Sequence, residues 1–357
     1  DVPQENLCSP AVSGGPFNSS IVFVGTNDGM MHAFRDCDGQ EIWSFVPDNV
    51  LPYLKYLPEL EHTSYVDSPP SIYFHDVDSD GVVDSGDGDK VVMVFGQRRG
   101  GGKNTLDSAA RGAYYALNIT NPADPQLLWK FSIDESSALA ETWALPAIHT
   151  VKVPGNDNAA SVLAFIPAGY DNNEDLRYGS TQAFPNTTDA TTNINQASTG
   201  GTVDGTGPAL TSPGSDADGY AMRGKGLIAI EVAYLSRADA DTDLTAQIAP
   251  SIERDSIGKV FWSYAPSDMK YSFVSDIRAL DLNRNGGFID KLYVGDAGGN
   301  MWRIDTSNRD KSLWSGNIIF SSNSTYAPSN TGYIDGTADN NSGRKIFYPP
   351  AVALEGG

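Results

Sequence analysis

The sequence predicts an all-β fold of repeated antiparallel sheets, the blades of a β-propeller with long loop insertions. Three observations predict it. A pattern of apolar strand, glycine-containing turn, second strand and tryptophan-bearing strand recurs four times. The 36 Gly and 21 Pro residues suit many short strands joined by turns. The 357 residues fit one large repeat-built domain, residues 1–357, whose last residues resemble the opening strand of a further unit.

The four copies of the repeat follow one another along the chain. The first comprises 21–34 with a tryptophan strand at 39–45. The later copies comprise, in order, 112–118 with 127–131, 226–231 with 258–264, and 292–305 with 313–314. Because aromatic and apolar side chains at recurring positions fill the space between blades, we interpret the tryptophans as core residues and not as a cofactor site.

The segments between the copies differ in character. Residues 47–57 are expected to form a short helix with Asp48 at its N-cap. Residues 170–223 consist mainly of Thr, Asn, Asp, Ser and Gly and have no apolar periodicity, so we expect a long, polar, exposed loop. A loop of this length inside a compact domain usually carries a function or is disordered.

The stretch 76–84, Asp-Val-Asp-Ser-Asp-Gly-Val-Val-Asp, is the strongest candidate for chemistry. It places carboxylates at loop positions 1, 3, 5 and 9, and a glycine at position 6 permits the sharp bend that lets them converge. Hard oxygen ligands in this number are those that Ca²⁺ prefers. The predicted metal ligands are four side chains and one backbone carbonyl: Asp76, Asp78, Asp80, Val82 (carbonyl) and Asp84.

The flanks of this loop indicate its setting. Residues 71–74 and 91–95 are rich in β-branched and aromatic residues, so the loop is expected to join two strands and not two helices. The alternative is an acidic turn without an ion. However, the sequence has no Lys or Arg between Val77 and Asp89 that could neutralise the carboxylates. Asp87, at position 12, either adds a ligand, directly or through water, or adds only negative field.

Charge and hydropathy exclude some partners. With 24 basic against 45 acidic residues, the formal net charge is −21, which disfavours nucleic acid and anionic membranes. No run of eighteen apolar residues is present, so membrane insertion is not expected. The chain begins at Asp1 and not at Met, so we interpret it as a processed or excised portion of a longer protein.

The two cysteines, Cys8 and Cys37, form an even pair in a chain that we expect to be exported. One disulfide between them would tether the N-terminal segment to the turn around residues 36–39. The alternative is two free thiols in a reducing compartment.

Two motifs resemble a known family. Residues 24–34, and later 275–281 through 293–305 with their Tyr-Val-Gly-Asp and Asn-Met-Trp-Arg-Ile-Asp runs, are similar to the C-terminal propeller domain of the PilY1/PilC family of type IV pilus tip-associated adhesins and assembly factors. The resemblance implies a modified propeller of about seven blades and a calcium loop of the type seen here. It also implies a role at the bacterial cell surface in pilus biogenesis and extension, twitching motility and adhesion.

Pilins or minor pilins at the pilus tip are the partners that this resemblance implies, and it names no host or abiotic surface ligand. The family often carries a calcium loop directly before the Tyr-Val-Gly-Asp strand. Here residues 281–290 have two Asn and an extra Gly, and Arg278 and Arg284 lie nearby. An ion-free turn is the favoured interpretation, with a second calcium site left open. No Arg-Gly-Asp motif and no von Willebrand-like part occur in this sequence.

Two other functions compete with a pilus-associated binding module. Quinone-dependent dehydrogenases are propellers with similar Gly, Asp and Trp signatures, but they stack their cofactor on a vicinal cysteine pair, which this chain lacks. The histidines show no metal spacing, and the Gly-rich run 96–103 lacks the pattern of a phosphate loop. The scattered histidines are His32, His62, His75 and His149. A carbohydrate-binding propeller unrelated to pili is the second alternative. We therefore expect a protein that is not an enzyme.

Overall fold

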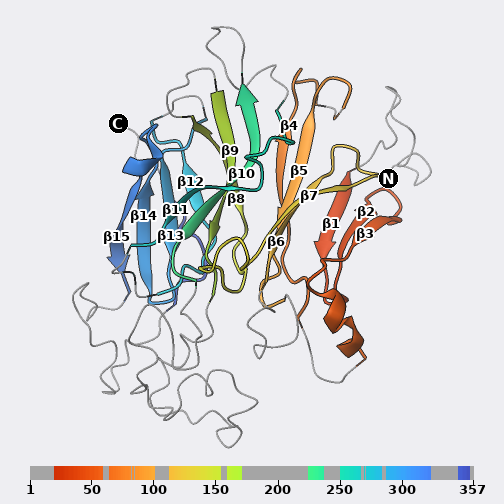
Figure 1. The fold of residues 1–357 in the computed structure, drawn as a ribbon, viewed down its shortest axis with the longest axis horizontal. Coiled ribbons are helices and arrows are strands. Elements are labelled where there is room, and N and C mark those ends of the chain that lie inside the picture. The colour runs from red at the N-terminus through yellow and green to blue at the C-terminus, as the bar shows by residue number, and fades with distance from the viewer. Residues whose placement is uncertain are drawn as a thin grey trace, which may run out of the picture.

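The chain folds as an all-β protein in the computed structural model (Figure 1). The structure describes residues 20–58, 64–81, 83, 85–100, 112–153, 159–170, 224–236, 250–266, 269, 271–283, 287–322 and 345–353. Of the predicted polar loop 170–223, only Tyr170 belongs to these residues, and 171–223 lie outside them.

Every named strand belongs to one of four antiparallel sheets. The first sheet contains β1 (Ile21–Gly25), β2 (Met31–Arg35) and β3 (Glu41–Phe45). The second contains β4 (Ser71–His75), β5 (Lys90–Phe95), β6 (Tyr114–Asn118) and β7 (Gln126–Phe131). The third contains β8 (Ala147–Lys152), β9 (Ala159–Pro167), β10 (Leu227–Ser236) and β11 (Val260–Tyr264). The fourth contains β12 (Arg278–Leu280), β13 (Lys291–Gly295), β14 (Asn300–Asp305) and β15 (Ser315–Ser321).

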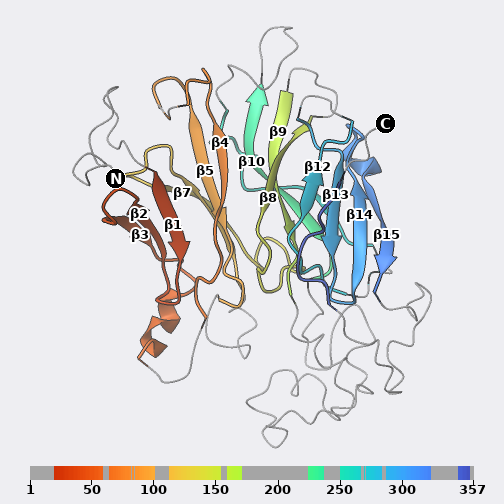
Figure 2. The same cartoon turned by 180° about the vertical axis from the view of Figure 1, so that it is seen from behind.

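The sheets are arranged as propeller blades. Within each sheet the strands pair in chain order, and Figures 1 and 2 show the four sheets standing side by side. The first strands of neighbouring sheets meet, since β8 contacts both β4 and β12. The first strand of each of these blades is therefore the innermost one. The described residues form four blades, and the family's count of about seven stays an expectation.

The predicted repeat is confirmed, with further strands added. Trp43, Trp129 and Trp262 lie in β3, β7 and β11, and Trp314 lies directly before β15. In the second sheet the predicted copy corresponds to β6 and β7, and β4 and β5 are the two strands expected beside the acidic loop. In the third sheet the copy corresponds to β10 and β11, so the sequence did not predict β8 and β9, and in the fourth sheet it did not predict β12. Strand β1 of the first sheet corresponds to β13 of the fourth, because both strands end at a glycine that opens a five-residue turn. One turn is closed by a hydrogen bond from the Thr26 N–H to the Met30 carbonyl oxygen, and the other by a hydrogen bond from the Asp296 N–H to the Asn300 carbonyl oxygen.

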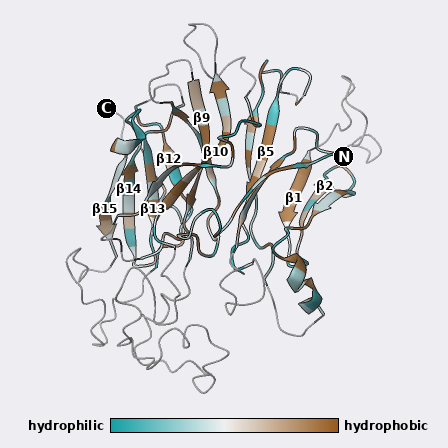
Figure 3. Ribbon diagram, viewed as in Figure 1, coloured by the Kyte–Doolittle hydropathy of each residue, from teal (hydrophilic) through white to brown (hydrophobic). Residues whose placement is uncertain are grey.

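The hydrophobic core lies between successive blades, as expected of the aromatic and apolar repeat positions. All nine residues of β9 are buried, because its two faces pack against the second and the fourth sheets. Hydrophobic residues, brown in Figure 3, are distributed over the strands of all four sheets. Burial of this kind stabilises by roughly 25 cal/mol per Å² of apolar surface, so the blade interfaces are the main source of stability.

The predicted helix in residues 47–57 is a short 3-10 helix, Leu51–Tyr56, with Val50 at its N-cap. The prediction of Asp48 as the N-cap is therefore wrong. The Asp48 carboxylate instead accepts hydrogen bonds from the Tyr115 hydroxyl at 2.6 Å and from Lys130 Nζ at 2.9 Å. These charge-assisted partners on the second sheet are stronger than a cap bond at an exposed helix end. In the described part of the chain no helix is long and apolar enough to cross a membrane.

Candidate metal site

The acidic loop joins the innermost strand β4 to the second strand β5, as the flanking sequences predicted. Asp76 directly follows β4, and Asp89 directly precedes β5. The two strands pair in a regular antiparallel ladder that ends with His75 opposite Lys90. This last pair closes the root of the loop, so residues 76–89 extend beyond the edge of the blade.

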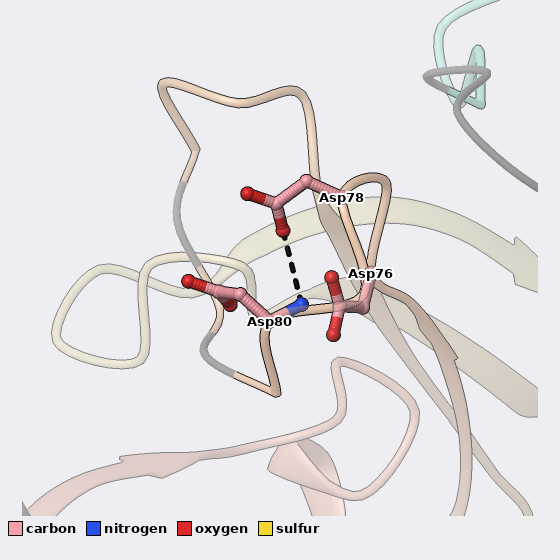
Figure 4. A group of neighbouring side chains, drawn as sticks. All are labelled: Asp76, Asp78 and Asp80. Carbon is pink, nitrogen blue, oxygen red and sulfur yellow. Dashed lines mark hydrogen bonds between the residues drawn. The ribbon is translucent and has the colours of Figure 1, made fainter.

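Three of the predicted ligands come together. One carboxylate oxygen from each of Asp76, Asp78 and Asp80 lies within 4.8 Å of the others. Figure 4 shows the three side chains gathered at one side of the loop. Asp76 is half-buried, whereas Asp78 and Asp80 are exposed. The two remaining predicted ligands, Val82 and Asp84, lie outside the described residues.

The backbone folds around Asp76, the first residue of the loop. Its Oδ1 accepts the Ser79 N–H at 2.6 Å, and its Oδ2 accepts the Gly81 N–H at 2.8 Å. Asp78 Oδ1 accepts the Asp80 N–H at 3.2 Å. Gly81 has φ 81°, a conformation that glycine takes without strain, which is the reason for glycine at position 6. The tight bend brings alternate carboxylates to one side.

The carboxylates differ in their electrostatics. The Gly81 N–H hydrogen bond holds the pKa of Asp76 below its ordinary value. The pKa of Asp78 is raised: the hydrogen bond from the Asp80 N–H opposes this shift, while desolvation and the negative charges of Asp80 and Asp87 drive it. Asp87 thus adds negative field to the site. Like charges at this spacing repel, and a bound divalent cation would remove the repulsion.

The donor set fits Ca²⁺. The three clustered groups are hard carboxylate oxygens on a loop without Lys or Arg, and no described His or Cys joins them. Such ligands suit hard cations such as Ca²⁺ or Mg²⁺ better than transition metals. The cluster of Asp76, Asp78 and Asp80 can therefore hold a metal ion.

The loop at 281–290 has a related but different arrangement. Asp281 directly follows β12, and its Oδ2 accepts the Gly287 N–H at 3.0 Å. Asp290 is fully buried directly before β13, and its Oδ2 accepts the Asn283 N–H at 2.7 Å. This loop contains two carboxylates and not three, because Asn283 and Asn285 stand at the alternate positions where the loop 76–84 carries aspartates. The ion-free turn therefore stays a prediction.

The other candidate residues are dispersed in the structure. His32 lies between the carboxylates of Asp28 and Glu41, at 2.9 and 2.7 Å, and His149 is half-buried in β8. His62 lies outside the described residues. Cys37 is buried in the turn between β2 and β3, whereas Cys8 is not among the described residues, so the disulfide stays a prediction.

Two buried carboxylates were not singled out from the sequence. Asp89 is 1% exposed, and its Oδ1 accepts the Val77 N–H at 2.8 Å. Asp296, in the turn between β13 and β14, is also 1% exposed. The only sequence signal for Asp89 is an aspartate directly before a buried strand, where a solvated charge is the commoner interpretation.

Comparisons with known proteins relate the chain to pilus proteins. No family model matches. The chain is 25% identical over 299 residues to a type IV pilus biogenesis factor PilY1 homolog of Xylella fastidiosa, a match that covers 82% of the chain and 14% of that relative. It is 31% identical over 132 residues to the type IV pilus biogenesis factor PilY1 of Pseudomonas aeruginosa, covering 36% of the chain and 10% of that protein.

Among solved structures, the C-terminal domain of Pseudomonas aeruginosa PilY1 aligns with 93% of this chain and 49% of that chain, at 16% identity and a TM-score of 0.47. The chain thus spans only a small part of the length of the curated relatives that it matches.

Proposed function

We propose that this chain, a homologue of the type IV pilus biogenesis factors of the PilY1 type, is a calcium-binding β-propeller that acts at the pilus tip. It works by binding and not by catalysis, in pilus biogenesis and extension, twitching motility and surface adhesion. The observation that carries the proposal is the sequence match over 299 residues, which covers 82% of the chain. The place of action is the outer surface of the bacterium.

Calcium is the finer part of the proposal. Its ligands are Asp76, Asp78, Asp80, the carbonyl oxygen of Val82 and Asp84, and the convergence of the first three carboxylates supports it. Without the ion the carboxylates repel, and the tip of the loop opens. The ladder of β4 and β5 keeps the remainder of the blade in place, so calcium changes a local surface without unfolding the domain.

The partners that we propose are pilins or minor pilins at the pilus tip. The formal net charge of −21 supports a protein partner over nucleic acid or an anionic membrane, because both of these need clustered Lys and Arg. Capture of the purified domain on isolated pili, compared with binding to a panel of glycans, separates this reading from a carbohydrate-binding propeller. Glycan binding without pilus binding would contradict the proposal.

Calorimetry with chelator-stripped protein tests the ion site. Asp76→Ala and Asp80→Ala are each expected to abolish calcium binding or weaken it at least tenfold, because each removes one charged ligand. Asp124→Ala is the matched control, since Asp124 is an exposed aspartate in the turn between β6 and β7 whose carboxylate accepts a hydrogen bond from the nearby Gln126 Nε2 at 2.8 Å. Unchanged calcium affinity in both loop variants would place the site elsewhere.

The cellular role is tested in bacteria that carry Asp76→Ala or Asp80→Ala in the full-length gene. Surface piliation, twitching motility and adhesion are expected to fall, while the Asp124→Ala strain behaves as wild type. Normal piliation, motility and adhesion in both loop mutants, with calcium binding verified as lost, would leave a purely structural ion.

A further inference from the structure

Asp89 holds the acidic loop from outside the predicted ligand set. It is the last residue before β5 and is 1% exposed, and its Oδ1 accepts the N–H of Val77 at 2.8 Å. The bond therefore spans the root of the loop, from the second strand of the blade back to the second residue of the loop. A buried carboxylate is costly unless it is hydrogen-bonded, and a charge-assisted bond to a backbone N–H is among the stronger kinds.

This bond determines where the first ligand points. The Val77 N–H belongs to the same planar peptide group as the Asp76 carbonyl, so a fixed N–H direction fixes the backbone of Asp76. The Asp76 carboxylate then accepts the N–H groups of Ser79 and Gly81, which folds the tip of the loop over it. The contacts form a continuous series from Asp89 through the Val77 peptide to Asp76 and the tip.

A related arrangement occurs at the β12–β13 connection, with the clamped N–H at the third residue of the loop and not at the second. There the last residue before the second strand, Asp290, is fully buried and accepts the Asn283 N–H, while Asp281 accepts the Gly287 N–H. Gly287 has φ 84°, close to the 81° of Gly81. The two loops differ in length, in their acidic residues and in the position of the clamped N–H. What they share is a buried aspartate directly before the second strand that accepts a backbone N–H near the start of the loop.

We propose that Asp89 is the positioning residue of the metal loop: it clamps the Val77 peptide and so orients Asp76 for the cation. The inference rests on the proposed calcium site for its function. It implies that the root of the loop stays closed when the ion leaves, because the clamp is a bond within the protein. Only the tip beyond Asp76, with the exposed Asp78 and Asp80, then responds to calcium.

Two substitutions at Asp89 distinguish the role of its hydrogen bond to Val77 from the role of its negative charge. In Asp89→Asn the amide oxygen can still accept the Val77 N–H, so calcium affinity by calorimetry is expected within about threefold of wild type. In Asp89→Ala the acceptor is absent, and the affinity is expected to fall about tenfold or more, as for other residues that orient metal ligands. Asp89→Val, equally without an acceptor, replaces the alanine variant if that one does not fold.

Controls distinguish the clamp from other effects. Asp296→Ala removes an equally buried turn carboxylate in the fourth sheet, outside both acidic loops, and is expected to leave calcium affinity unchanged. An equal loss there would overturn the proposal in favour of general destabilisation. Asp87→Asn removes a nearby exposed charge and measures the field effect alone. Equal losses in Asp89→Asn and Asp89→Ala would make Asp89 a source of charge or a ligand, and unchanged affinity in both would also overturn the positioning role.

The hydrogen-exchange rate of the Val77 amide reports on its hydrogen bond to Asp89 in the absence of calcium. In chelator, exchange is expected to be slow in the wild type and in Asp89→Asn, and at least tenfold faster in Asp89→Ala. If the wild type bound no calcium, the proposed function would fail, whereas this exchange pattern would still establish the clamp. Equal exchange in all three proteins would refute the clamp itself, whatever the calcium affinity.

Discussion

Replacing Asp296 by Asn is expected to remove a distinct pH dependence from the stability of the domain. The Asp296 carboxylate is 1% exposed in the turn between β13 and β14. It accepts hydrogen bonds from the backbone N–H groups of Gly298 and Asn300, from the Asn300 side-chain amide, and from Trp302 Nε1 at 2.8 Å. All of these donors are neutral, so only their dipoles offset the cost of burying the charge.

Burial raises the pKa of Asp296 from 3.8 to about 6, although the hydrogen bonds from Trp302 and Asn300 lower it. The difference of about 2 pH units corresponds to about 3 kcal/mol at about 1.4 kcal/mol per unit. Between pH 4 and 6 the folded state binds this proton and the unfolded state does not, so stability falls as the pH rises. The contribution is fully present below pH 4 and lost above pH 6.

Urea unfolding of wild type and Asp296→Asn at half-unit steps from pH 4 to 7 is the assay. The difference in unfolding free energy between the two proteins is expected to change by about 3 kcal/mol across this range, with wild type losing more as the pH rises. The change with pH, and not the offset at one pH, is the readout, because the new amide N–H₂ group facing Trp302 Nε1 costs about 1–3 kcal/mol at every pH.

Asp305→Asn serves as the matched control for this experiment. Partial burial of Asp305 opposes the shift, but its bonds to Lys291 and Ser307 lower its pKa to about 2. The stability that Asp305 contributes is present above pH 4 and is lost only as the pH falls toward 2, so its difference profile is flat from pH 4 to 7. A flat profile for Asp296→Asn as well would show that burial does not raise the pKa of Asp296.

Two further predictions concern covalent and backbone structure. Peptide mapping by mass spectrometry without reduction is expected to find a Cys8–Cys37 disulfide, which would stabilise by roughly 3 kcal/mol in the loop-entropy model, and two free thiols would contradict it. Gly169→Ala is expected to destabilise by more than about 1 kcal/mol in thermal unfolding, because Gly169 has φ 102° and a Cβ there would lie 2.1 Å from the Glu141 carbonyl oxygen. Gly39→Ala, at φ 72° with open space around the new Cβ, is expected to cost less, and equal costs would contradict the steric argument.

The strands of a blade could be predicted from the sequence where the packing between neighbouring sheets repeats along the chain. Each tryptophan strand faces an adjacent blade, so the same apolar spacing recurs in β3, β7 and β11. The innermost strands β8 and β12 carry no such signal. β12 is only three residues long, Arg-Ala-Leu, and most of β8 is half-buried, so neither shows a clear alternation of apolar and polar residues.

The metal loop was readable for a different reason. Its predicted ligands lie within nine consecutive residues, and the convergence of the three described carboxylates, Asp76, Asp78 and Asp80, follows from one local bend that ends at Gly81. The contact between Asp89 and Val77 joins residues twelve apart and depends on the pairing of β4 with β5, which the loop sequence does not contain. The burial of Asp296 likewise depends on the packing of the fourth sheet. In both cases a tertiary contact converts an ordinary turn aspartate into a buried, structural one.

The position of the loop limits how far a bound ion can act. β5 is the second strand of its blade, and its side chains alternate between two hydrophobic clusters: Val92 and Val94 pack toward the third sheet, and Val91, Met93 and Phe95 toward the first. A shift of β5 would therefore disturb two blade interfaces at once, which costs far more than a rearrangement of exposed carboxylates. The end of the loop at Asp89 is thus held more firmly than the exposed Asp78 and Asp80. Under the proposed function, a calcium ion would add two positive charges to the acidic tip, so a partner in contact with that tip would distinguish the two states by charge as well as by shape.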